Sequence, residues 1–89
     1  MMYPYITLND ETLITHSQML DNGGVKSVEV HFERPVEYGF DSARCVLPSY
    51  EWILIEGYSD EEIKTFELFL RSNAHLLFRY AEGGGLRIA

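Results

Sequence analysis

The side chains best suited to chemistry alternate along one predicted strand. Glu29, His31 and Glu33 occupy every second position, so they share one face of that strand. An imidazole beside carboxylates can bind a metal ion or act as a general base. His16 and Arg44, from neighbouring strands, would join the set. The same alternation is also typical of the solvent face of a half-buried sheet, and the spacing matches no established metal motif.

Cys45 is a second candidate, because a thiolate is a strong nucleophile when a histidine and an electropositive setting activate it. It alternates with Ala43 and Leu47, which favours a buried, inert thiol. A single cysteine cannot form an internal disulfide, and this is typical of a reducing compartment.

The predicted C-terminal helix offers a candidate surface for a partner. Its outward side carries basic residues around one leucine, and this stripe could contact an acidic partner or be an ordinary solvated helix face. The stripe consists of Lys64, Leu68, Arg71, His75 and Arg79.

Seven aromatic residues between positions 50 and 80 form another candidate set. They could line a ligand pocket, but packing in the core is the simpler expectation. Any that stay exposed beside Leu68 would mark a protein-binding patch or a dimer interface. The set is Tyr50, Trp52, Tyr58, Phe66, Phe69, Phe78 and Tyr80.

The segment Ser59–Glu82 is the strongest structural signal, and it predicts one amphipathic helix. Ser59 and Glu62 have the spacing of a capping box. Asn73 lies inside the apolar sector, so its amide must find a hydrogen-bond partner unless it breaks the helix in two. Gly83 is expected to end the helix in the left-handed conformation.

The chain before this helix predicts a sheet. Asp21-Asn22-Gly23-Gly24 indicates a tight hairpin, Asn9-Asp10-Glu11 a turn, and Arg34–Gly39 a loop. The connections are short, so an antiparallel meander is the simplest topology. The expected strands are Tyr3–Leu8, Thr12–Leu20, Val25–Glu33 and Phe40–Leu47.

Between the sheet and the long helix, Ser49 can cap a short helix over Tyr50–Glu56. Ile53-Leu54-Ile55 could equally form a buried strand, because a short apolar run is ambiguous. We therefore expect one α+β domain over residues 1–89. It would contain a four-stranded, mostly antiparallel sheet at about 3–47, with helices at about 49–56 and 59–82 on one face, and a flexible tail at 83–89 that either frays or ends in a short strand.

Composition narrows the functional classes. The formal net charge is −7, with fourteen acidic and seven basic residues, which argues against binding to a nucleic-acid backbone. No signal peptide and no transmembrane segment are expected, so the sequence predicts a soluble cytoplasmic protein. No cofactor is expected. Gly83-Gly84-Gly85 follows a helix instead of opening one, so it is not a phosphate-binding loop.

The chain resembles a small uncharacterised family of short bacterial proteins. The resemblance is carried by VHFERP (Val30–Pro35), by GFDSARC and LPSYEW within Gly39–Trp52, by EGYSDEEI (Glu56–Ile63), and by NAHLL and YAEGG within Asn73–Gly84. It implies no activity, cofactor or catalytic residue. Short accessory proteins of this kind favour an interaction role.

These observations favour a small, non-enzymatic protein-interaction or regulatory module that pairs with itself or with another protein. A first alternative is a small metal-dependent or acid–base hydrolase using His31, Glu29, Glu33 and His16 on the polar sheet face. It requires these side chains to converge in one concave site. A second alternative is an acidic regulator that occupies the basic surface of another protein.

Overall fold

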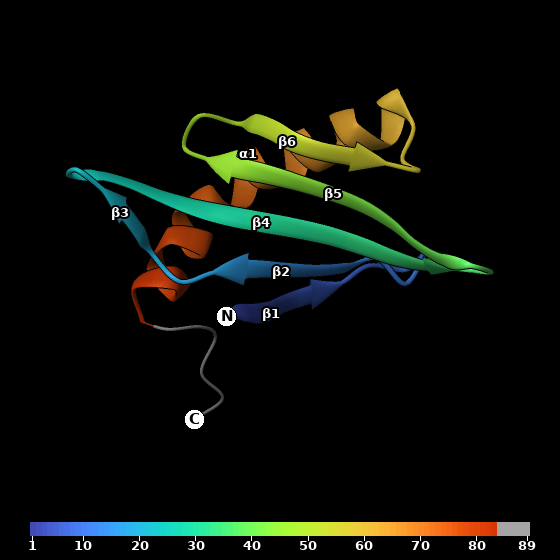
Figure 1. Ribbon diagram of the computed structural model, residues 1–89, viewed down its shortest axis with the longest axis horizontal. Helices are drawn as coiled ribbons and strands as arrows, with labels where there is room; N and C mark the ends of the chain where they lie inside the picture. The colour runs from blue at the N-terminus through green and yellow to red at the C-terminus, as the bar shows by residue number, and fades with distance from the viewer. Residues whose placement is uncertain (84–89) are drawn as a thin grey trace.

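One antiparallel sheet and one long helix make up the fold. The computed structural model describes residues 1–83. The strand order is β1-β2-β4-β5-β6, and the short strand β3 pairs with one end of β4. Figure 1 shows helix α1 lying across one face of this sheet. The elements are β1 (Met2–Thr7), β2 (Leu13–Ser17), β3 (Leu20–Asn22), β4 (Val25–Val36), β5 (Gly39–Leu47), β6 (Glu51–Glu56) and α1 (Asp60–Glu82).

The predicted hairpin before β4 is confirmed. Gly23 and Gly24 connect Asn22 to Val25 with φ angles of 65° and 89°. Both angles are positive, which a two-residue turn of this kind requires and which glycine adopts at little cost. The carboxylate of Asp21 accepts a hydrogen bond from the Gly24 amide.

The sheet is larger than the four strands that the sequence predicts. The segment Thr12–Leu20 is interrupted at Gln18 and Met19, so it supplies β2 and the start of β3. Arg34–Gly39 is not a loop, because β4 continues to Val36 and only Glu37 and Tyr38 form the turn. Pro35 is tolerated there because β2 stops pairing at Glu33, which leaves that side of β4 without a strand that needs its missing N–H.

The predicted short helix at 49–56 is wrong. Glu51–Glu56 forms β6, which pairs with β5 at the edge of the sheet. Six residues are too few to stabilise an isolated helix, whereas β5 offers the backbone of these residues hydrogen-bond partners. The alternative of a strand at Ile53–Ile55 was therefore the better interpretation, although the strand is not buried, since Ile53 and Ile55 are about half exposed at the sheet edge.

The core lies between α1 and the face of the sheet that it covers. Phe32 of β4 stacks on Phe66 of α1, with ring centroids 4.3 Å apart. Cys45 is fully buried in the same core, as its alternation with apolar residues predicts. The other core side chains come from both layers and from the connection between β6 and α1, and are Ile14, Val28, Val30, Ala43, Leu47, Tyr58, Ile63, Leu70, Leu77 and Ala81.

Helix α1 is continuous, as predicted, and it begins with the expected capping box. The Ser59 hydroxyl accepts a hydrogen bond from the Glu62 amide, and the Glu62 carboxylate accepts one from the Ser59 amide. Asn73 does not break the helix. Its amide nitrogen donates to the carbonyl of Phe69 at 2.8 Å, and its oxygen accepts from the Tyr5 hydroxyl at 2.7 Å.

The end of α1 differs from the prediction. Gly83 has φ −83° and ψ −1°, so it is right-handed, and its amide donates to the carbonyl of Arg79. One more residue of helical geometry closes the helix here, and no left-handed residue is required. The rest of the predicted tail, from Gly84 onward, lies outside the described residues. Within residues 1–83, no helix is both long and apolar enough to cross a membrane.

Candidate functional site

His31 and Glu29 form a close pair on the sheet face that α1 does not cover. His31 lies between Thr15 of β2 and Arg44 of β5 in the strand register. Its Nε2 is 2.7 Å from a carboxylate oxygen of Glu29, and the two side chains are 14% and 28% exposed. This contact joins two of the residues that the sequence predicts for acid–base chemistry.

His16 lies on the opposite face of the sheet, away from His31. It is completely buried beneath Tyr3 and Tyr5, whose rings are 5.7 and 6.4 Å from its own. Its Nδ1 donates to the carbonyl of Ser17 at 2.8 Å, because a carbonyl oxygen can only accept. Since the sheet separates the two imidazoles, they cannot act on one substrate atom.

Glu33 shares the face of His31, but its strand neighbours are Leu13 and Ser42. The predicted set of four therefore contains one close pair, one separate carboxylate and one core histidine. Across residues 1–83, no group of three or more His, Cys, Asp or Glu side chains is arranged to hold a metal ion.

The surroundings of Cys45 keep its thiol unreactive. Burial, together with the negative charge of Glu67, raises the pKa of Cys45 to about 11. The thiolate is the reactive form, so this thiol is held in its unreactive state near neutral pH.

The predicted basic stripe does lie on the exposed side of α1. Lys64, Leu68, Arg71, His75 and Arg79 are all exposed, and Leu68 is 68% exposed. Arg71 is not free, because its guanidinium lies 4.5 Å from the ring centre of Tyr50 in the turn between β5 and β6. One member of the stripe is thus engaged in holding α1 to the sheet.

Most of the predicted aromatic set packs inside the molecule. Trp52 lies against Phe32, and Tyr58 lies edge-on to Phe66. The exposed aromatic residues are different ones. Tyr38 is 94% exposed and Phe40 is 63% exposed, both at the turn between β4 and β5. Their position follows from the length of that hairpin, which the sequence did not predict.

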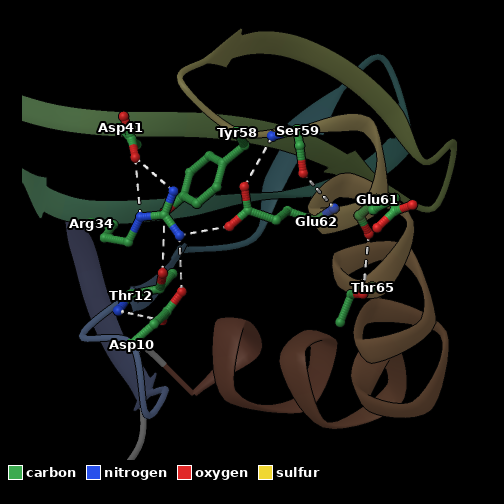
Figure 2. Close-up of polar contacts among 9 residues, drawn as sticks. All are labelled: Asp10, Thr12, Arg34, Asp41, Tyr58, Ser59, Glu61, Glu62 and Thr65. Carbon is green, nitrogen blue, oxygen red and sulfur yellow. Dashed lines mark hydrogen bonds and ion pairs between the residues drawn. The ribbon is translucent and has the colours of Figure 1, made fainter.

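Sequence reasoning missed a charged cluster around Arg34, drawn in Figure 2. The Arg34 guanidinium donates to Asp41 at 2.7 and 3.0 Å, to Glu62 at 2.6 Å and to Asp10 at 3.1 Å. It also lies 4.6 Å from the ring centre of Tyr58. The cluster therefore links the loop after β1, strands β4 and β5, and the first turn of α1.

Electrostatics within the cluster favour the charged forms. The hydrogen bond from Arg34 and the Ser59 amide lower the pKa of Glu62. The amide of Thr12, and then Arg34, lower the pKa of Asp10. In return, hydrogen bonds to Glu62 and Asp41 raise the pKa of Arg34. Glu62 serves both the capping box and the cluster, one oxygen for each.

A pocket of about 280 Å³ opens beside this cluster. It is small, since sites for small molecules commonly enclose about 300–1,000 Å³. Its two carboxylates, Asp10 and Glu62, already bind Arg34. Arg34 and its three carboxylate partners therefore form a clamp, in the sense that their ion pairs hold α1 against the sheet. The pocket is lined by Leu8, Asn9, Asp10, Glu62, Thr65 and Phe66.

Large apolar side chains are exposed at several places on the sheet, among them Ile6, Leu13 and Val25, and two regions are considered as contact surfaces. The first is the β4–β5 turn, with Val36 at 47% exposure beside Tyr38 and Phe40. The second is the edge strand β6, where Ile53 and Ile55 are 49% and 47% exposed. Apolar groups gathered in this way are typical of surfaces that contact another protein.

No protein-family model, curated protein or solved structure matches this chain. The functional argument therefore depends on the geometry of the two exposed apolar regions.

Proposed function

We propose that this protein acts by binding another protein chain and not by catalysis. The observation that carries the proposal is the end of the β4–β5 hairpin. Tyr38 and Phe40 are 94% and 63% exposed there, and aromatic side chains supply much of the energy in the centre of protein interfaces.

The hairpin end has the accessibility that a docking element needs. β2 pairs with β4 only as far as Glu33, and β6 pairs with β5 only as far as Ser42. Beyond those points β4 and β5 pair only with each other, up to Val36 and Gly39. Figure 1 shows this hairpin extending past the ends of the neighbouring strands. A partner can therefore approach Tyr38 and Phe40 without displacing another element.

The candidate chemistry supports binding over catalysis. The predicted acid–base set is divided by the sheet, because His16 is a core residue and His31 lies on the open face. The Cys45 thiol is buried. The Arg34 cluster joins structural elements through bonds that already occupy its carboxylates.

The test is whether the purified protein associates with itself or with another protein. Native mass spectrometry over a range of concentrations would report a homodimer, and immobilised protein would be used to retrieve partners from a bacterial lysate. A retained protein counts only if it rebinds in purified form. We expect one of these associations. A strict monomer with no partner that rebinds would overturn the proposal.

A further inference from the structure

The second exposed apolar region is strand β6, which forms an open edge of the sheet. Within residues 1–83 it pairs with β5 alone. In an antiparallel pair, every second residue of an edge strand points its amide and carbonyl away from the sheet. These groups form a ready site for another strand.

The two edges of the sheet differ in how well they are protected. Both have a register irregularity, which lies between Pro4 and Ile6 in β1 and opposite Arg44 and Cys45 of β5 in β6. Strand β1 also contains Pro4, which cannot donate a hydrogen bond, and proline discourages the addition of a strand. The sequence of β6, EWILIE, has no proline and no lysine. Of the two edges, β6 is therefore the more open to a partner strand.

The charges at the ends of β6 indicate which side chains the partner strand should carry. Glu51 and Glu56 are its first and last residues and both are exposed. Between them, Ile53 and Ile55 are about half exposed. Opposite charges placed across neighbouring strands attract, and like charges repel. The complementary strand is apolar in its middle and basic at both ends.

We propose that β6 binds an extended segment of a partner protein that has an apolar centre flanked by lysine or arginine. The segment adds to the sheet as a further strand, with main-chain hydrogen bonds supplying affinity and the flanking charges supplying selectivity. This inference rests on the proposed function, and it specifies a partner class for an edge separate from the β4–β5 turn.

A second copy of the chain fits this edge less well. Antiparallel pairing of two β6 strands over their full length puts Glu51 of each copy opposite Glu56 of the other. Each chain also carries a formal net charge of −7. Repulsion at both ends and between the whole molecules opposes such a dimer.

The probes are three capped peptides of six residues, the length of β6, so that their terminal charges can lie opposite Glu51 and Glu56. One alternates valine and threonine between terminal lysines, one has glutamates in place of the lysines, and one keeps the lysines with a central proline. Trp52 lies in β6 and is the only tryptophan, so its fluorescence reports binding, and amide chemical shifts locate it. We expect the lysine peptide to bind, to perturb β6 amides, and to bind about tenfold more tightly than the other two.

Charge reversal provides the decisive comparison. E51K/E56K should invert the preference, so that the glutamate peptide binds more tightly than the lysine peptide. Both side chains are exposed, so the fold should persist, and circular dichroism checks this. E11K/E82K is the matched control, because it makes the same change in net charge at exposed residues outside β6 and should keep the original preference.

Several outcomes overturn the inference. They are equal affinity for lysine and glutamate peptides, amide changes confined to other strands, an unchanged preference in E51K/E56K, or no binding at millimolar peptide. If a partner still binds the protein despite such a result, the inference fails and the proposed function stands. If the lysine peptide binds at β6 but no protein partner is found, the preference of β6 for a strand with basic ends stands and the proposed function fails.

Discussion

Arg34 connects more segments of this molecule than any other charged residue described above. It binds Asp41 across the β4–β5 ladder, Asp10 in the loop before β2, and Glu62 in the first turn of α1. Its side chain is 21% exposed, so water screens these pairs only in part. Three carboxylates would face one another without it.

We expect R34M to destabilise the protein by about 1–2 kcal/mol, because it removes charge-assisted hydrogen bonds that are only partly screened. Urea unfolding followed by circular dichroism measures this. Arg44 lies on the neighbouring strand and is exposed, so R44M is the matched control and should change stability by less than about 0.5 kcal/mol. Equal losses in both variants would show that the cluster is not a clamp.

Gly57 supports the same cluster through its backbone. Its φ is +88°, and a Cβ added there would overlap the Asp41 carboxylate. We expect G57A to cost about 2–4 kcal/mol, from strain and from displacement of Asp41. G23A is the control, because Gly23 has φ +65° and open space around it, and should cost about 1 kcal/mol. Chemical denaturation of both variants compares them, and a smaller loss for G57A would contradict the geometry.

At the scale of elements, the helix was the most predictable part of the molecule. Its capping box, apolar period and half-buried Asn73 amide all lie within one continuous segment, so local rules suffice. The Gly23-Gly24 hairpin was predictable for the same reason. Strand β6 was not, because the short apolar run Ile53-Leu54-Ile55 is compatible with helix or strand until its neighbour is known.

The contact between β1 and α1 gives a test at this scale. Y5F removes the hydroxyl that bonds Asn73, and it leaves the half-buried amide oxygen of Asn73 without that donor. We expect a loss of about 1 kcal/mol, which lowers the melting temperature by about 4–8 °C in a domain of this size. Y3F removes a hydroxyl from the same strand and should change the melting temperature little. A matching decrease in both variants would refute the role assigned to Asn73.

The candidate site was less predictable than the elements. The partners of Arg34 lie 7, 24 and 28 positions away along the chain, so only the folded register brings them together. The pairing of His31 with Glu29 was predictable, because residues two apart share a strand face. The burial of His16 was not, since it depends on which face of β2 the helix covers.

For the molecule as a whole, the lowered pKa values of Asp10 and Glu62 predict how stability depends on pH. A carboxylate whose pKa is lower in the folded state stabilises the fold while it is ionised. This stability is fully present above the ordinary carboxyl pKa of about 4. It is lost as the pH falls through the lower folded values, when protonation breaks the bonds to Arg34.

Urea midpoints measured between pH 7 and pH 2.5 test this dependence. The wild type should lose stability progressively below about pH 4. R34M should show a shallower loss over the same range, because its carboxylates have no guanidinium to bind. Parallel curves for the two proteins would contradict the assignment of this acid sensitivity to the cluster.

The most direct test of the central claim measures the affinity of the protein for whichever chain it binds, its own or another. Y38S/F40S removes the exposed aromatic rings of the β4–β5 turn, and L68S removes an apolar side chain that is 68% exposed on a different element, α1. We predict that Y38S/F40S weakens binding by at least about tenfold, as expected for aromatic residues at the centre of an interface, while L68S binds like the wild type. Unchanged affinity in a correctly folded Y38S/F40S variant would contradict the account.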